Sequence, residues 1–238
     1  MTTQKINGVE KIPTNDCPIV EKTVKSGSSD LARIEIKTQH PLDLFKEWHE
    51  EAKKYSNGIP NALCLATVSK DLRVSARHVI LRDYDERGFV IVTDSRSRKS
   101  HELEEVPKAA MCILWAYPNE KHQNISRQVR IEGNVEKLSP PEFRYLYDRE
   151  PVYCKIRSYL CCQGEKVDWN NQKNIHDKLV QDVQDGKQDL SMPEHFIAYR
   201  LCPESMEFYF AYDHLIADRL LFTKASDDSS WTNLRIAA

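Results

Sequence analysis

Apolar residues along this chain recur with two different periods, and the change of period separates predicted helices from predicted strands. Residues 1–40 have neither period: they are polar, with scattered Lys, Asp, Ser and Thr, and we expect a mostly disordered arm there. Pro41 then stands at a suitable first helical position, and helical spacing continues as far as Gly58. The apolar positions of this predicted amphipathic helix are Leu42, Leu44, Phe45, Trp48 and Ala52.

The segment 75–103 predicts a strand, a turn, a second strand and the start of a helix. Val79–Leu81 and Phe89–Val92 are short apolar runs rich in β-branched residues, and turn-like residues separate them. We therefore expect a β-hairpin, which residues 61–69 extend to a three-stranded meander. Ser97 is a suitable N-cap for the helix that follows.

The rest of the chain continues mainly as strands. Residues 109–115 are apolar on both faces, which is typical of a central strand, and alternation within 125–137 places Gln128 and Arg130 on one polar face. Further strands are expected at 109–115, 125–137, 196–201, 205–212, 220–224 and 231–236, and further helices at 139–148 and 165–186. About eight strands, about four helices and no βαβ alternation predict a mainly antiparallel β-barrel with peripheral α-helices.

Composition narrows the classes of function. The 34 basic and 36 acidic residues nearly cancel, so no global charge favours nucleic acid or an anionic membrane. The N-terminus lacks the apolar core of a signal peptide, and the longest apolar run, 109–117, is too short to span a bilayer. Seven cysteines without a CxxC pair, and eight scattered histidines, predict reduced thiols, a cytoplasmic protein and no metal site.

One local feature predicts an anion site. Ser97, Arg98 and Lys99 stand where helical patterning begins, so backbone N–H groups, the helix dipole and two cations can converge on a phosphate. The alternative is that both cations are solvated surface charges. Common nucleotide, zinc and serine-hydrolase motifs are absent. The remaining cations and amides, dispersed along the chain, are Arg77, Arg82, Gln128, Arg130, Arg149 and Arg219.

Three ordered stretches carry a resemblance to a known family. They are NALCLATVSKDLRVSARHVILRDYDERGFVIVTDSRSRKSHEL, then RQVRIEG, then the closing pattern MEFYF…DRLLF…W…LRIAA. Together they resemble pyridoxine (pyridoxamine) 5′-phosphate oxidase, and the likeness extends from Leu42 to the C-terminus. It implies an FMN-binding split β-barrel over residues 41–238, including a C-terminal dimerisation-type region, and a homodimer with FMN at the subunit interface.

The resemblance also implies which residues hold FMN. The matching positions are Arg77, His78, Val79, Ile80, Val92, Thr93, Arg98, Lys99, Gln128, Gln163, Gly164, Tyr209 and Arg219. Two of them depart from the family pattern. Tyr209 stands where the family usually has Trp, which keeps a ring but loses the indole N–H, and Gln163-Gly164 replaces a Gln-Ser pair.

The implied substrate site departs further. Tyr145 and Arg149 match the residues that grip the substrate phosphate. Arg82 replaces a Lys, which keeps the charge but changes the hydrogen-bond geometry, and Cys154 replaces a Ser after a one-residue shift. In a final loop the family has Arg and His over the vitamin B6 ring, and this chain has Leu215 and Ala217.

Three functions are compatible with these residues. The first is FMN-dependent oxidation of pyridoxamine or pyridoxine 5′-phosphate to pyridoxal 5′-phosphate, with oxygen reduced to hydrogen peroxide. The second is an FMN- or pyridoxal-phosphate-binding paralogue with weak or no oxidase activity, because Leu215 and Ala217 remove two polar side chains. The third is a different flavin reaction in a more apolar pocket. The expected partners are a small phosphorylated B6 vitamer and a second copy of the chain.

Overall fold

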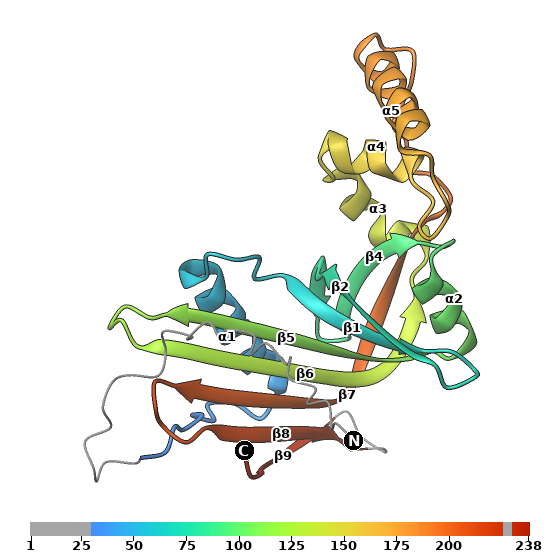
Figure 1. Ribbon diagram of the computed structural model, residues 1–238. Coiled ribbons are helices and arrows are strands. Elements are labelled where there is room, and N and C mark those ends of the chain that lie inside the picture. The colour runs from blue at the N-terminus through green and yellow to red at the C-terminus, as the bar shows by residue number, and fades with distance from the viewer. Residues whose placement is uncertain (1–29, 226–229) are drawn as a thin grey trace, which may run out of the picture.

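The structure, a computed structural model, describes residues 30–225 and 230–238. Its described strands form one antiparallel sheet with helices around it (Figure 1). The strands are β1 (Ala62–Val68), β2 (Val74–Ile80), β3 (Asp83–Asp85), β4 (Gly88–Asp94), β5 (Lys108–Pro118), β6 (Asn124–Lys137), β7 (Phe196–Tyr212), β8 (Asp218–Lys224) and β9 (Trp231–Arg235). The helices are α1 (Pro41–Tyr55), α2 (Arg98–Glu105), α3 (Pro140–Asp148), α4 (Val152–Leu160) and α5 (Trp169–Gln184).

The sheet branches at strand β7, which gives the arrangement of a split barrel. It pairs with β6 along its length, whereas on its other edge its first half pairs with β4 and its second half with β8. The strand order is β2-β1-β5-β6-β7-β4-β3, with β8 and β9 branching from β7. At the register shift in β6, a Cβ atom on Gly133 would lie 2.0 Å from the carbonyl oxygen of Cys202, so this close approach needs glycine.

Helix α1 packs on the core of the sheet. All five apolar positions predicted for it are buried, so the predicted amphipathic helix is confirmed. The ring of Phe45 packs edge-on against that of Phe89, with centroids 4.9 Å apart, and the Trp48 ring packs in the same way against Phe208. The central position of residues 109–115 is also confirmed, because β5 lies between β1 and β6.

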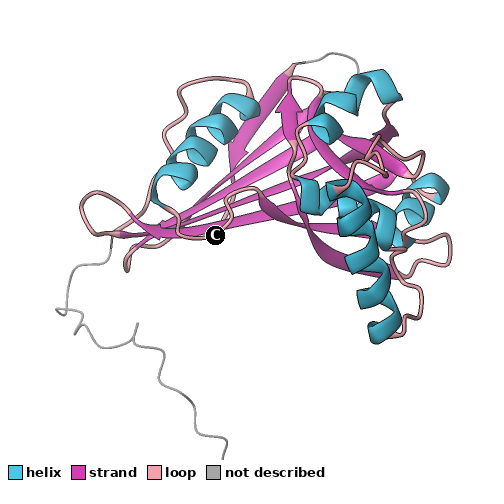
Figure 2. Cartoon of the chain, turned by 90° about the horizontal axis from the view of Figure 1, so that it is seen from above, coloured by secondary structure: helices cyan, strands magenta, loops and turns pink. Residues whose placement is uncertain are grey.

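Helices α3, α4 and α5 project from the end of the sheet remote from α1 (Figure 1). Seen from above, the helices form separate groups around the strands rather than one layer (Figure 2). The predicted capping box of Ser139 and Glu142 opens α3, and Tyr147 packs edge-on against Phe196 with centroids 4.9 Å apart. Helix α5 has no buried residue, as predicted for a surface helix. None of the described helices is long and apolar enough to cross a membrane.

The predicted central hairpin is wrong in its pairing. Strand β2 pairs with β1, while β4 pairs with β3 and β7, so β2 and β4 lie far apart in the strand order. The turn-like residues between them include the short strand β3, which forms the hairpin with β4. The hairpin therefore forms between the consecutive strands β3 and β4, and not between the two longer strands that the apolar runs predicted.

One predicted strand break is also wrong, and one helix was not predicted. The separate strands 196–201 and 205–212 are one strand, β7, because β6 pairs with both halves across the irregularity near Gly133. Helix α4 was not expected from the pattern, and its single buried residue, Ile156, explains the weak signal.

Residues 30–40, the described part of the predicted N-terminal arm, lie against the rest of the fold. Ala32 and Ile34 are buried there. The Ala32 backbone N–H donates to the carbonyl of Ile216 at 2.8 Å, and the two chain segments form a parallel bridge. Burial and pairing fix a segment whose composition alone is polar. Residues 1–29 lie outside the described chain.

Candidate functional site

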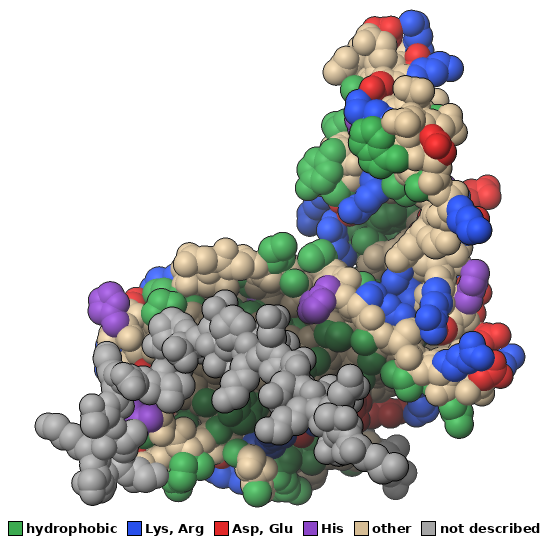
Figure 3. Space-filling model, in the orientation of Figure 1, with side chains coloured by type: hydrophobic (Ala, Val, Ile, Leu, Met, Phe, Trp, Pro, Cys, Tyr) green, Lys and Arg blue, Asp and Glu red, His purple; other side chains and the backbone are tan. Residues whose placement is uncertain are grey.

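Three cations and one carboxylate meet where β2 approaches the start of α2. We call this set the basic cluster: Arg77 on β2, Arg98 and Lys99 at the start of α2, and Glu102 one turn later. The nearest guanidinium nitrogens of Arg77 and Arg98 lie 3.2 and 2.7 Å from the Glu102 carboxylate. Figure 3 shows Lys and Arg side chains gathered over α2 and the adjoining end of the sheet.

Glu102 organises the basic cluster from a buried position, with 4% of its surface exposed. Burial acts to raise its pKa, but hydrogen bonds from Thr67, Ser75 and Arg98 outweigh burial and lower the pKa to about 2. The two hydroxyls are adjacent because Thr67 and Ser75 are register partners across β1 and β2. Glu102 therefore stays ionised and orients both guanidinium groups.

Lys99 differs from its neighbours because its ammonium group is buried without a carboxylate partner among the described residues. Its side chain hydrogen-bonds to the hydroxyls of Thr93 and Ser97, both at 3.1 Å, and to the Gln163 side-chain oxygen at 2.7 Å. Burial lowers the pKa of Lys99, and the positive charge of Arg77 lowers it further. A buried cation held only by neutral oxygens is stabilised by an added anion.

The start of α2 has the geometry predicted for it, with one difference. Ser97 occupies the N-cap position, but its side chain makes no capping hydrogen bond to the helix backbone. Its hydroxyl instead contacts the Ser100 hydroxyl at 3.0 Å and the Lys99 ammonium. Ser97 thus orients the lysine, while the N-terminus of α2 adds its partial positive charge to the same place.

A second group of predicted residues lies on the other face of the sheet. Gln128 of β6 is the register partner of Tyr209 of β7, which is in turn the partner of Arg219 of β8, so these side chains share one face. The Arg219 guanidinium lies 5.3 Å from the centre of the Tyr209 ring and 2.8 Å from the Glu207 carboxylate. Within β2, residues alternate: His78 and Ile80 are exposed, whereas Arg77 points inward.

The other predicted FMN residues have more ordinary surroundings. Val79 and Val92 pack at the edges of the two hydrophobic cores. Gly164 has a φ of +99°, which favours glycine and gives a local reason for Gly at this position. Near the start of α2, Glu102 joins Arg77 to Arg98, and Lys99 joins Thr93 to Gln163.

The predicted substrate residues form a third group, the Arg82 cluster: Arg82, Asp83, Tyr145, Arg149 and Glu150. Arg82 forms an ion pair with buried Glu150, and the Tyr145 hydroxyl donates to the Asp83 carboxylate. Burial, followed by this hydrogen bond, raises the pKa of Tyr145 to about 12. The Arg149 guanidinium lies 5.4 Å from the centre of the Tyr145 ring. Every member is thus engaged by another.

Three of the departures from the family, Cys154, Leu215 and Ala217, take no part in these contacts. Cys154 is half-buried on α4. Leu215 and Ala217 are half-buried in the loop between β7 and β8, on either side of Ile216. Ile216 is fixed by backbone hydrogen bonds with Asp30 and Ala32. The loop that carries both substitutions therefore has a defined backbone.

Several residues that build these groups had no place in the sequence predictions. Glu102 was detectable in principle, because it stands four residues after Arg98 on a predicted helix. Thr67 and Ser75 depend on strand register, and Glu150 depends on a contact spanning 68 residues of sequence. No local sequence pattern reveals contacts that depend on strand register or on residues far apart in the chain.

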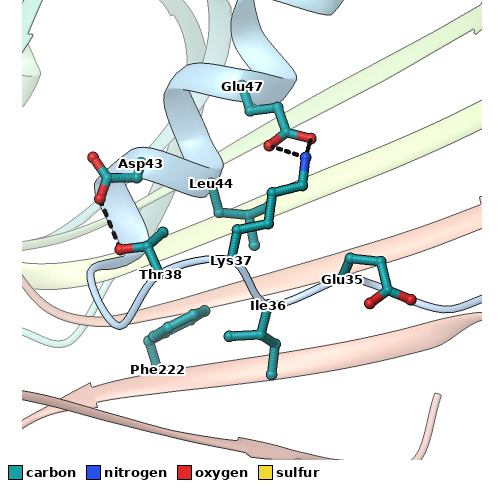
Figure 4. A pocket seen from close by; sticks show the side chains of 8 residues that line it. All are labelled: Glu35, Ile36, Lys37, Thr38, Asp43, Leu44, Glu47 and Phe222. Carbon is teal, nitrogen blue, oxygen red and sulfur yellow. Dashed lines mark hydrogen bonds and ion pairs between the residues drawn. The ribbon is translucent and has the colours of Figure 1, made fainter.

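A pocket of about 130 Å³ lies elsewhere, between the segment before α1, α1 itself and β8 (Figure 4). Its charged and polar groups pair with one another: Lys37 lies 2.9 Å from Glu47, and the Thr38 hydroxyl lies 2.8 Å from Asp43. None of the predicted site residues lines it. This pocket is therefore separate from the three groups described above.

Two family descriptions match the chain. Residues 49–157 match "Pyridoxamine 5′-phosphate oxidase", and residues 196–238 match "Pyridoxine 5′-phosphate oxidase C-terminal dimerisation region". A pyridoxine/pyridoxamine 5′-phosphate oxidase of Trichormus variabilis is 35% identical, over 84% of this chain and 89% of the relative. One from Paraburkholderia phytofirmans is 32% identical, over 92% of this chain and 97% of the relative.

Solved structures give a similar result. PhzG from Burkholderia lata, in complex with tetrahydrophenazine-1-carboxylic acid, has a TM-score of 0.75 and 27% identity, and the match covers 89% of this chain and 100% of that one. A pyridoxamine 5′-phosphate oxidase-related, FMN-binding protein of Nostoc punctiforme has a TM-score of 0.62 at 17% identity, over 82% of this chain and 96% of that one, which supports the fold alone. The predicted split-barrel fold is confirmed by these likenesses together with the observed sheet.

Proposed function

The chain belongs to the pyridoxamine 5′-phosphate oxidase family, and from this premise we propose that it oxidises pyridoxamine or pyridoxine 5′-phosphate to pyridoxal 5′-phosphate. As a member it is an oxidase of the flavoenzyme type, with FMN as its cofactor. In the proposed reaction the substrate loses two electrons and two protons, and oxygen becomes hydrogen peroxide. From the amine, water also enters and ammonia leaves.

The basic cluster fits the phosphate of FMN. Lys99 is the observation that carries this assignment, because the residue is 5% exposed and its ammonium hydrogen-bonds only to neutral oxygens among the described residues. Arg77 and Arg98 lie beside it and share one carboxylate, so positive charge is in excess. A phosphate dianion would supply the missing counter-charge.

Gln128, Tyr209 and Arg219 lie on the other face of the sheet from the basic cluster. Both groups can therefore contact one FMN only if they come from two different chains. Residues 196–238, which include β7, β8 and β9, match a dimerisation region. We therefore assign Gln128, Tyr209 and Arg219 of one subunit and the basic cluster of the other to a single site of a homodimer. In this arrangement Tyr209 and Gln128 would contact the flavin ring.

This chain's own residues would mainly bind and orient the substrate. FMN, when bound, supplies the redox chemistry by accepting a hydride and passing two electrons to oxygen. Arg82, Tyr145 and Arg149 position the ring substrate from the side of α3. The raised pKa of Tyr145 keeps its hydroxyl protonated near neutral pH, so it remains a hydrogen-bond donor.

The decisive experiment is anaerobic. The purified protein is loaded with FMN, pyridoxine 5′-phosphate is added without oxygen, and the flavin absorbance band is followed. Bleaching is the expected result. An unchanged band, with bound FMN demonstrated in the same sample, would exclude this substrate.

A second candidate is oxidation of a different ring compound. Leu215 and Ala217 favour it, because they replace a cation and an imidazole with apolar groups at a half-buried position. The related PhzG was solved with a carboxylic acid rather than a phosphate ester. Under this candidate, a reduced polycyclic acid would bleach the flavin band where pyridoxine 5′-phosphate does not. Bleaching by neither compound would support a binding paralogue.

A further inference from the structure

The contact between Arg82 and Glu150 is built into the fold. Nη2 of Arg82 lies 2.5 Å from Oε1 of Glu150, and the Glu150 side chain is only 4% exposed. Both backbones are held in place: the Arg82 N–H donates to Val90 at 2.9 Å, and the Glu150 N–H donates to Tyr147 at 2.9 Å. This is a fixed ion pair rather than a passing surface contact.

This pair changes the charge of the proposed substrate site. Arg82 and Arg149 are its cations, and Glu150 and Asp83 are its carboxylates, so the Arg82 cluster has no net charge. In the basic cluster, by contrast, three cations share one carboxylate. A phosphate dianion entering the Arg82 cluster meets the Glu150 carboxylate on the guanidinium it needs, and like charges at such distances repel.

We propose that Glu150 is a specificity-determining residue that takes the place of a substrate phosphate on Arg82, so that the site accepts ring substrates without a phosphate almost as well as phosphorylated ones. This inference rests on the proposed function, because that function assigns the Arg82 cluster to the substrate. Glu150 also lies between Arg149 and Cys154, the stretch in which the family likeness needs a one-residue shift.

The test compares two ligands that differ only in the phosphate. Pyridoxal 5′-phosphate and pyridoxal are titrated by calorimetry into the FMN-loaded protein, as wild type, Glu150→Gln and Asp148→Asn. Gln keeps the shape of Glu but removes its charge. We expect an affinity ratio below about tenfold for the wild type and a rise of about tenfold in that ratio for Glu150→Gln. Asp148 is an exposed carboxylate at the end of α3, so its variant should match the wild type.

If Glu150 had only a structural role, Glu150→Gln would weaken the binding of both ligands equally and leave their affinity ratio unchanged. That result would overturn the proposal. Glu150→Ala is a second test variant in case Glu150→Gln perturbs the fold. It also removes the charge and should shift the affinity ratio in the same direction. Unfolding temperatures of the variants show which one is intact.

Inorganic phosphate separates this inference from the proposed function. With FMN filling the basic cluster, added phosphate reports on the Arg82 cluster. We expect about tenfold tighter phosphate binding in Glu150→Gln than in the wild type, and loss of that gain in the Arg82→Gln, Glu150→Gln double variant. If neither vitamer binds but this pattern appears, the B6 assignment fails and the role of Glu150 stands. Equal phosphate binding in all variants would overturn the role of Glu150.

Discussion

The ammonium group of Lys99 lies 2.7 Å from the side-chain oxygen of Gln163, a contact between residues 64 positions apart in the sequence. It ties the start of α2 to the loop that follows α4, at the point where the projecting helices meet the sheet. The amide oxygen orients the ammonium without neutralising it. The cation thus remains available to an anionic ligand.

Lys99→Met should weaken FMN binding and leave the ligand-free protein at least as stable. Loss of a charge-assisted hydrogen bond to phosphate costs about 2 kcal/mol, or roughly thirtyfold in Kd. Removal of a buried cation without a carboxylate partner should raise the free energy of unfolding of the apoprotein by about 1 kcal/mol. Flavin fluorescence titration and urea unfolding measure the two effects.

Lys70→Met is the matched control, since Lys70 is an exposed lysine outside the basic cluster. It should change neither quantity by more than about 0.5 kcal/mol. A Lys99→Met protein that binds FMN with wild-type affinity would remove Lys99 from the phosphate site.

Glu102 should make the stability of the protein depend on acid pH. Its pKa in the folded state is about 2, against an ordinary value of 4.5, so its contribution to stability is fully present above pH 4.5 and is lost as pH falls through 2. The shift corresponds to about 3 kcal/mol. Urea unfolding of wild type and Glu102→Gln should therefore differ by about that amount at pH 7, and the gap should close towards pH 2.

Glu105→Gln provides the comparison, because Glu105 is exposed on the same helix. A gap between wild type and Glu102→Gln that stays constant from pH 7 to pH 2 would show that Glu102 acts through its shape rather than its charge.

Helices and strands with a strong local signal were predictable from the sequence. Every predicted apolar position of α1 is buried, and the alternation in β6 correctly separates Gln128 from the core. The pairing of β2 and the continuity of β7 were not predictable, because both depend on which strands meet across the sheet. Local periodicity carries no information on that choice.

The site divides in the same way. The placement of Arg98 and Lys99 at the start of a helix was predictable, and it is the basis for proposing an anion site there. Their environment was not: the burial of Lys99 depends on Thr93 and Gln163, and the engagement of Arg82 depends on Glu150. Those contacts decide whether a cation is free for a ligand, and each joins residues from different elements.

Gln163→Glu should give the Lys99 ammonium an internal counter-charge, which the native amide does not supply. A carboxylate at this position would pair with Lys99, which should stabilise the apoprotein and raise the Kd for FMN roughly tenfold, because the phosphate would then compete with an internal anion. Gln188→Glu adds the same charge at an exposed position and should leave FMN binding unchanged. Tighter FMN binding in Gln163→Glu would contradict the assignment of this contact to the phosphate site.

Leu215→Arg combined with Ala217→His should raise turnover of pyridoxine 5′-phosphate. Both residues lie in a loop whose backbone is fixed through Ile216, so new side chains there would start from a defined position. An oriented charged contact to a ligand contributes about 1.5–3 kcal/mol, which predicts a gain of roughly ten- to a hundredfold in kcat/KM. Leu215→Met with Ala217→Ser changes the same positions without adding charge and should leave kcat/KM near the wild-type value. A flat or lower rate in the Arg and His variant would mean that this loop does not face the substrate ring, and it would favour the alternative of a different ring compound.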